Sequence, residues 1–91
     1  MSSRVTQNQL KGIVALINKR TNSPTETYTL DETGHFTANI GNYHLSGAYG
    51  GWALHRIVNE DGGTTDVSGM GFATKRDLET FLGGFLEGLE S

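Results

Sequence analysis

The spacing of apolar residues changes period twice along this chain, and these changes limit the folds available to it. Apolar side chains recur at every third or fourth position in residues 10–17 and again in residues 78–89, which is the period of an amphipathic helix. Apolar and polar residues alternate between these stretches, from Thr25 to Val67, as they do in strands with one buried face. No helical stretch separates the strands to provide a parallel crossover. We therefore predict an α+β fold in which N- and C-terminal helices pack on one face of an antiparallel sheet of three to five strands.

Both helices begin with residues that can cap them. Thr6 and Gln9 have the spacing of a capping box, in which each side chain bonds the backbone N–H of the other residue. The first helix should therefore start at Thr6 and stop at the turn residues 21–24. Thr74 and Asp77 repeat this spacing with a shorter acid, and they should open the last helix.

Turn residues divide the middle of the chain into strands. Tyr28–Leu30 and Phe36–Ile40 alternate in polarity on either side of a turn at residues 31–34, which predicts a β-hairpin. Gly41-Asn42 could then turn the chain into a new strand at residues 43–45. A single bent strand running from the hairpin through residue 45 fits the pattern nearly as well.

The following segment contains the best strand candidate of the chain, residues 52–58. A glycine-rich loop is expected before it, at residues 46–51, and a short edge strand after it, at residues 64–67. Leu54 and Ile57 would lie on opposite faces of a regular strand. That strand should therefore either contain a bulge or be buried on both faces.

Length and composition exclude several classes of protein. A chain of 91 residues suits one α+β domain over residues 1–91, and the lack of cysteine excludes disulfides, thiolate zinc sites and thiol nucleophiles. The net charge is −3 and the basic residues are scattered along the chain, which argues against binding to DNA or RNA. No apolar run approaches the roughly 20 residues that span a membrane, so we expect a soluble protein.

The segment Gly41–Gly63 concentrates glycine, aromatic and histidine residues. Its aromatic residues could simply be sheet core, or they could form a binding surface, because tyrosine, tryptophan and arginine anchor many interfaces. Tyr49 lies between loop glycines and is the aromatic residue that we expect to be most exposed. Gly69-Met70-Gly71 leads into a helix whose first turn is basic, where an anion could bind. The candidate binding residues are Tyr43, His44, Tyr49, Trp52, His55, Arg56, Lys75 and Arg76.

The histidines do not have the pattern of a metal or catalytic site. His44 and His55 could face each other across a hairpin with His35 in a neighbouring turn, but their spacing matches no helical two-histidine motif. We therefore expect ordinary histidines on a polar face, with no metal and no cofactor. No nucleophile-elbow sequence accompanies His44, His55 and Glu60, so we expect no enzyme, and a metal-dependent hydrolase is the least favoured function.

Three motifs together resemble a family of small uncharacterised proteins encoded by tailed bacteriophages and prophages. They are G-N-Y-H-L-S-G-A-Y-G-G, N-E-D-G-G and T-K-R-D-L, and the similarity extends from Tyr28 to about Gly88. The chain departs from the family pattern at Ser46, where an acid is usual, and at Asp61, where glycine is usual. A role for a carboxylate at position 46 is therefore not carried over to this chain.

This resemblance implies a phage accessory protein in the cytoplasm of the bacterial host. By analogy, such a protein binds a host protein, for example a defence component, and inhibits or redirects it. The alternative is a binder of a nucleotide signal or other small anion, in which Tyr43 or Trp52 stacks on the base and Lys75 and Arg76 hold phosphate. We also expect a homodimer, formed through an edge strand or through the glycines at positions 84 and 88 of the last helix.

Overall fold

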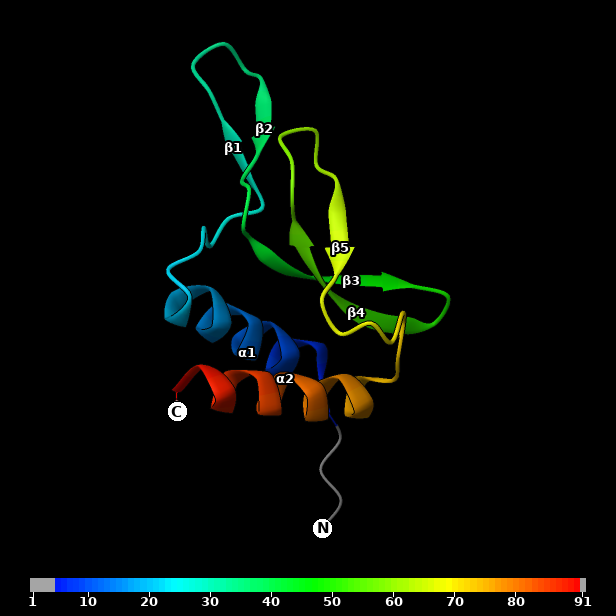
Figure 1. Cartoon of the computed structure of the whole chain (residues 1–91). Coiled ribbons are helices and arrows are strands. Elements are labelled where there is room, and N and C mark those ends of the chain that lie inside the picture. Colours follow the sequence, from blue (N-terminus) through cyan, green and yellow to red (C-terminus); the bar gives the residue numbers. More distant parts are fainter. Residues whose placement is uncertain (1–4, 91) are drawn as a thin grey trace.

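A computed structural model of the chain describes residues 5–90, and it has the predicted α+β fold (Figure 1). The order of elements is α1 (Gln7–Arg20), β1 (Tyr28–Leu30), β2 (Phe36–Ala38), β3 (Tyr43–Ala48), β4 (Gly51–Ile57), β5 (Thr64–Asp66) and α2 (Lys75–Glu90). The strands form two antiparallel sheets, a hairpin β1-β2 and a three-stranded sheet in the order β3-β4-β5.

Both predicted helix starts are confirmed. The Thr6 side chain accepts a hydrogen bond from the Gln9 N–H at 3.1 Å, and the Gln9 side chain accepts one from the Thr6 N–H at 2.7 Å. The Thr74 hydroxyl likewise accepts a hydrogen bond from the Asp77 N–H at 3.1 Å. These bonds satisfy N–H groups that have no partner within the helix, which fixes where each helix begins.

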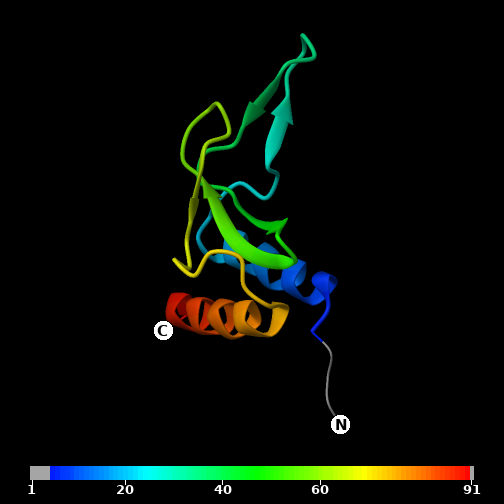
Figure 2. The same ribbon diagram turned by 90° about the vertical axis from the view of Figure 1, so that its right-hand side faces the viewer.

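The two helices lie side by side on one face of the three-stranded sheet and point in the same direction (Figures 1 and 2). Their C-terminal ends meet at an exposed ion pair of 3.2 Å between Arg20 and Glu90. The apolar stripes of both helices meet the sheet in one core, and burial of this core is the main source of stability. Its buried residues are Leu10, Val14, Ile17, Tyr43, Leu54, Leu78 and Leu82.

Strand β4 is buried on both faces, which was one of the two alternatives left open by the sequence. Its pairing with β3 is continuous from Tyr43↔Arg56 to Ala48↔Gly51, without a bulge. Leu54 therefore points to the helices while Ile57 points to the other face, and both are buried.

The hairpin β1-β2 stands apart from the three-stranded sheet and projects away from the helices (Figure 2). The chain leaves the hairpin through a turn at Gly41, whose φ is 95°. Asn42 is buried there and donates a hydrogen bond from Nδ2 to the carbonyl oxygen of Pro24 at 2.8 Å. The tight turn is thus confirmed over the single bent strand.

The glycine-rich loop predicted at residues 46–51 was wrong in extent. β3 continues to Ala48, and only Tyr49 and Gly50 form the turn. Gly47 lies inside β3, and the ring of its cross-strand partner Trp52 covers it. A Cβ atom at this position would lie 3.1 Å from the ring. Glycine therefore serves here to admit an aromatic ring and does not bend the chain.

Candidate functional site

Tyr49 occupies the most unusual backbone position for its residue type. Tyr49 and Gly50 have φ angles of 54° and 75°, so they form a two-residue hairpin turn with both residues left-handed. Asparagine and glycine adopt this conformation readily, whereas a bulky residue is strained in it. The Tyr49 side chain is 97% exposed, so little packing offsets this strain.

Four rings follow one another on the sheet face opposite the helices, and we call them the aromatic row: Tyr49, Phe72, His55 and His44. The ring centroids are 5.8 Å apart for Tyr49 and Phe72, 5.8 Å for Phe72 and His55, and 6.0 Å for His55 and His44. His44 and His55 are direct cross-strand partners in the register of β3 and β4. The row thus joins three of the predicted binding residues, Tyr49, His55 and His44, through Phe72.

Phe72 was missed in the sequence because its position depends on a contact between distant segments. Its neighbour Ala73 forms two hydrogen bonds with Trp52, of 2.7 and 2.8 Å, which extend the sheet beside β4. A Cβ atom at Gly51 would lie 2.9 Å from the Phe72 carbonyl carbon, so glycine is required for this approach. The only sequence signal was an aromatic residue directly after Gly69-Met70-Gly71.

The loop before α2 binds a carboxylate of the chain itself. Asp66 accepts hydrogen bonds from the Gly71 N–H at 2.7 Å, the Ser68 hydroxyl at 2.9 Å and the Ser68 N–H at 3.2 Å. Burial alone would raise the pKa of Asp66, but these donors outweigh it and hold the pKa below its usual value of 3.8. The N–H groups of the loop proposed for anion binding are thus directed to Asp66, and the basic residues Lys75 and Arg76 follow on the first turn of α2.

Two predicted binding residues, Tyr43 and Trp52, lie on the helix-facing side of the sheet. Tyr43 is buried and makes an edge contact with Phe85, with ring centroids 5.9 Å apart. The guanidinium of Arg56 lies 5.0 Å from the Tyr43 ring centroid, which is within the range of a cation–π contact. Trp52 is partly buried and packs against the core. Neither ring belongs to the aromatic row.

His44 is partly buried and lies beside a second imidazole, that of His55. The pKa of His44 is lowered, first because burial penalises the charged ring and second because the charge of His55 repels it. Its Nδ1 lies 3.3 Å from Oδ1 of Asn42. Within residues 5–90, no three histidine or acidic side chains are grouped so that they could hold a metal ion.

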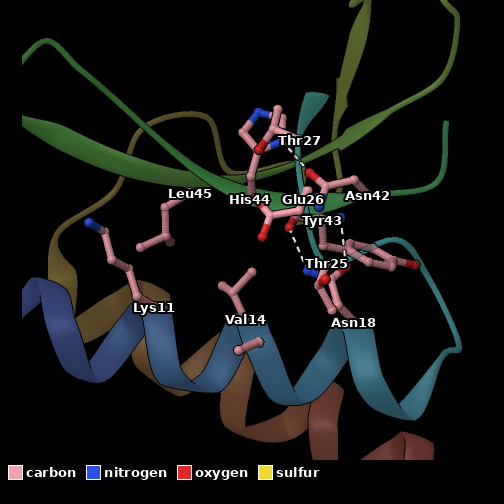
Figure 3. A pocket seen from close by; sticks show the side chains of 11 residues that line it. Lys11, Val14, Asn18, Thr25, Glu26, Thr27, Asn42, Tyr43, His44 and Leu45 are labelled. Carbon is pink, nitrogen blue, oxygen red and sulfur yellow. Dashed lines mark hydrogen bonds between the residues drawn. The ribbon is translucent and has the colours of Figure 1, made fainter. Parts of the chain in front are cut away.

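An open groove of about 450 Å³ lies between α1 and β3, and of the aromatic row only His44 lines it (Figure 3). Asn18 is one of its lining residues, and the Asn18 side-chain amide bonds the Tyr43 main chain. The groove lining is mixed in polarity and includes one cationic and one anionic side chain. The lining residues are Lys11, Val14, Ala15, Asn18, Thr25, Glu26, Thr27, Asn42, Tyr43, His44 and Leu45.

The chain matches no protein-family model, no curated protein and no solved structure. Neither helix in the described part of the chain is long and apolar enough to cross a lipid bilayer. The candidate site therefore rests on the geometry of the aromatic row itself.

Proposed function

We propose that this protein is a phage-encoded binding protein without catalytic activity, which docks on a host protein in the bacterial cytoplasm and inhibits or redirects it. The aromatic row is its docking surface. The proposal of a phage origin rests on the resemblance of three sequence motifs to a family of phage proteins.

The main support for the proposal is the strained and exposed position of Tyr49. An exposed tyrosine in a left-handed turn costs stability, and asparagine would form the same turn with less strain. A residue that weakens the fold and makes little contact within it is explained if its ring contacts another molecule. Tyrosine suits this purpose because its large rigid ring loses little conformational entropy when it binds.

The other three rings of the row form a continuous surface next to the Tyr49 ring. Phe72 lies beside Tyr49 and is partly exposed, and it connects the turn to His55 on the sheet. A partner that covers Tyr49 would therefore also cover Phe72, and the imidazoles would supply polar contacts at the inner end of the row. An apolar centre with polar groups at its edge is the usual arrangement of a protein interface.

The proposal is tested by quantitative capture of proteins from a lysate of the bacterial host. Immobilised wild type should retain a protein in stoichiometric amount, and Tyr49→Asn and Phe72→Leu should retain much less of it. Leu16→Ala is the matched control, because it removes an exposed apolar side chain from α1, far from the row. Equal recovery by wild type and Tyr49→Asn, or loss of recovery with Leu16→Ala alone, would count against the aromatic row.

A further inference from the structure

The hairpin β1-β2 is amphipathic, and its apolar side is exposed except at its base, where Ala38 is buried. The pairs Tyr28↔Ala38 and Leu30↔Phe36 place the large apolar side chains on one face, while Thr29 pairs with Thr37 on the other. We call Tyr28, Leu30 and Phe36 the hairpin apolar face. These side chains are 51%, 56% and 64% exposed.

Hydrogen bonds on the polar side and at the tip hold the hairpin in shape. On the polar side, the Thr29 hydroxyl bonds Oδ1 of Asn39 at 2.8 Å, and Nδ2 of Asn39 bonds the Glu26 carbonyl at 2.9 Å. At the tip, Oδ1 of Asp31 accepts bonds from the Thr33 hydroxyl and N–H and from the His35 N–H. These bonds hold the exposed part of the apolar side, at Leu30 and Phe36, in a fixed shape, so it is preorganised for contact with something else.

The area of the face argues against a second copy of this chain as its occupant. Three side chains that are each about half exposed present roughly 300 Å² of apolar surface. Two such faces packed together would bury roughly 600 Å², well below the roughly 1,200 Å² that a stable interface usually needs. A larger partner surface is required.

The charge around the face points to the chemistry of that partner. Residues 21–55 contain Glu26, Asp31 and Glu32 but neither lysine nor arginine. The Thr33 hydroxyl and then the His35 N–H lower the pKa of Asp31, so this carboxylate is charged at neutral pH. Two copies of the hairpin would bring like charges together, whereas a basic surface would be attracted.

We infer that the hairpin apolar face is a second docking surface, and that it binds a partner protein presenting an apolar strip flanked by lysine or arginine side chains. This inference is independent of the aromatic row, since it rests on other residues. It would hold even if Tyr49 had no role in binding.

The probes are two short fluorescent peptides of equal length, one alternating valine with lysine and the other alternating valine with glutamate. Fluorescence anisotropy should show that the valine–lysine peptide binds the full-length protein at least about tenfold more tightly than the valine–glutamate peptide. Phe36→Thr and Leu30→Thr should each weaken binding about tenfold, because threonine keeps the strand but removes the apolar contact.

A pair of charge variants separates this surface from general attraction to an acidic protein. Glu26→Gln with Glu32→Gln removes one charge just before β1 and one at the hairpin tip, and Glu79→Gln with Glu87→Gln removes two from α2, at the opposite end of the molecule (Figures 1 and 2). Only the hairpin pair should weaken binding about tenfold, and Tyr49→Asn should leave it unchanged. Equal effects of both pairs, or binding that is indifferent to Phe36→Thr, would overturn the inference. So would a concentration-dependent dimer that Phe36→Thr abolishes in sedimentation.

Discussion

The side-chain amide of Asn18 forms two hydrogen bonds with the main chain of Tyr43, one to its carbonyl oxygen and one from its N–H, both of 2.9 Å. Asn18 thereby takes the place of a neighbouring strand at the outer edge of β3. Both residues are buried, so these bonds join α1 to the sheet at a position largely shielded from solvent. The start of β3, and with it the position of His44, is fixed by this contact.

Asn18→Ala should lower the free energy of unfolding by about 2–4 kcal/mol, because it leaves a buried N–H and a buried carbonyl of Tyr43 without partners. Urea unfolding measures this change. Asn8→Ala is the control, since Asn8 is exposed on the same helix, and its effect should stay within about 0.5 kcal/mol. Similar stabilities for the two variants would show that the amide contact contributes little.

Gly51→Ala and Gly84→Ala should have opposite effects on stability. A Cβ atom at Gly51 would collide with the Phe72 backbone at 2.9 Å, and relieving that overlap should cost about 1–3 kcal/mol. A Cβ atom at Gly84 would meet no described atom within 4 Å, so alanine should stabilise α2 by up to about 1 kcal/mol. Thermal unfolding compares them directly. A destabilising Gly84→Ala would instead support the expected dimer through that side of α2.

Stability should fall when the pH is lowered from about 7.5 to about 5.5, and His44 should be one cause. The pKa of His44 is below its ordinary value of 6.5 in the folded chain, so the unfolded chain binds a proton first. The contribution of His44 to the free energy of unfolding is therefore constant above pH 6.5. It decreases as the pH falls through 6.5, until His44 is protonated in the folded protein as well. The pKa values of Asp31 and Asp66 are lowered from 3.8 in the folded chain. The stability that these two carboxylates contribute is therefore lost only below about pH 3.8, outside this window.

Urea midpoints across this pH range measure the effect. His44→Gln should reduce the slope, whereas Asn8→Ala, which replaces an exposed residue and removes no titratable group, should not. The same slope in His44→Gln and wild type would show that His44 is not responsible.

Features that depend on neighbouring residues could be predicted from the sequence. The caps at Thr6 and Thr74 and the hairpin around residues 31–34 each involve side chains a few positions apart, so the pattern alone identified them. The spacing of Leu54 and Ile57 also indicated correctly that β4 could be buried on both faces.

Features that depend on contacts between distant segments could not be predicted. Gly47 suggested a loop, but it lies in β3, where the ring of its cross-strand partner Trp52 packs over it. Phe72 joins the aromatic row only through the bridge between Ala73 and Trp52. Asn18 gave a weak signal, because it lies four positions after Val14 and therefore beside the apolar stripe of α1, but its partner on β3 is 25 residues away.

Replacing Tyr49 should not weaken the fold. Tyr49→Asn relieves the strain of a left-handed tyrosine and loses only an exposed ring contact with Phe72. The free energy of unfolding should stay the same or rise by up to about 1 kcal/mol. A loss of more than about 1 kcal/mol in urea unfolding would mean that the tyrosine is kept for stability.

The decisive measurement for the role of Tyr49 is the dissociation constant of Tyr49→Asn for the host protein captured by the wild type. Calorimetry on the purified pair should show a dissociation constant at least about tenfold higher than that of the wild type, as for a central aromatic anchor. An unchanged dissociation constant would contradict the account, since the strained and exposed ring would then have no part in binding.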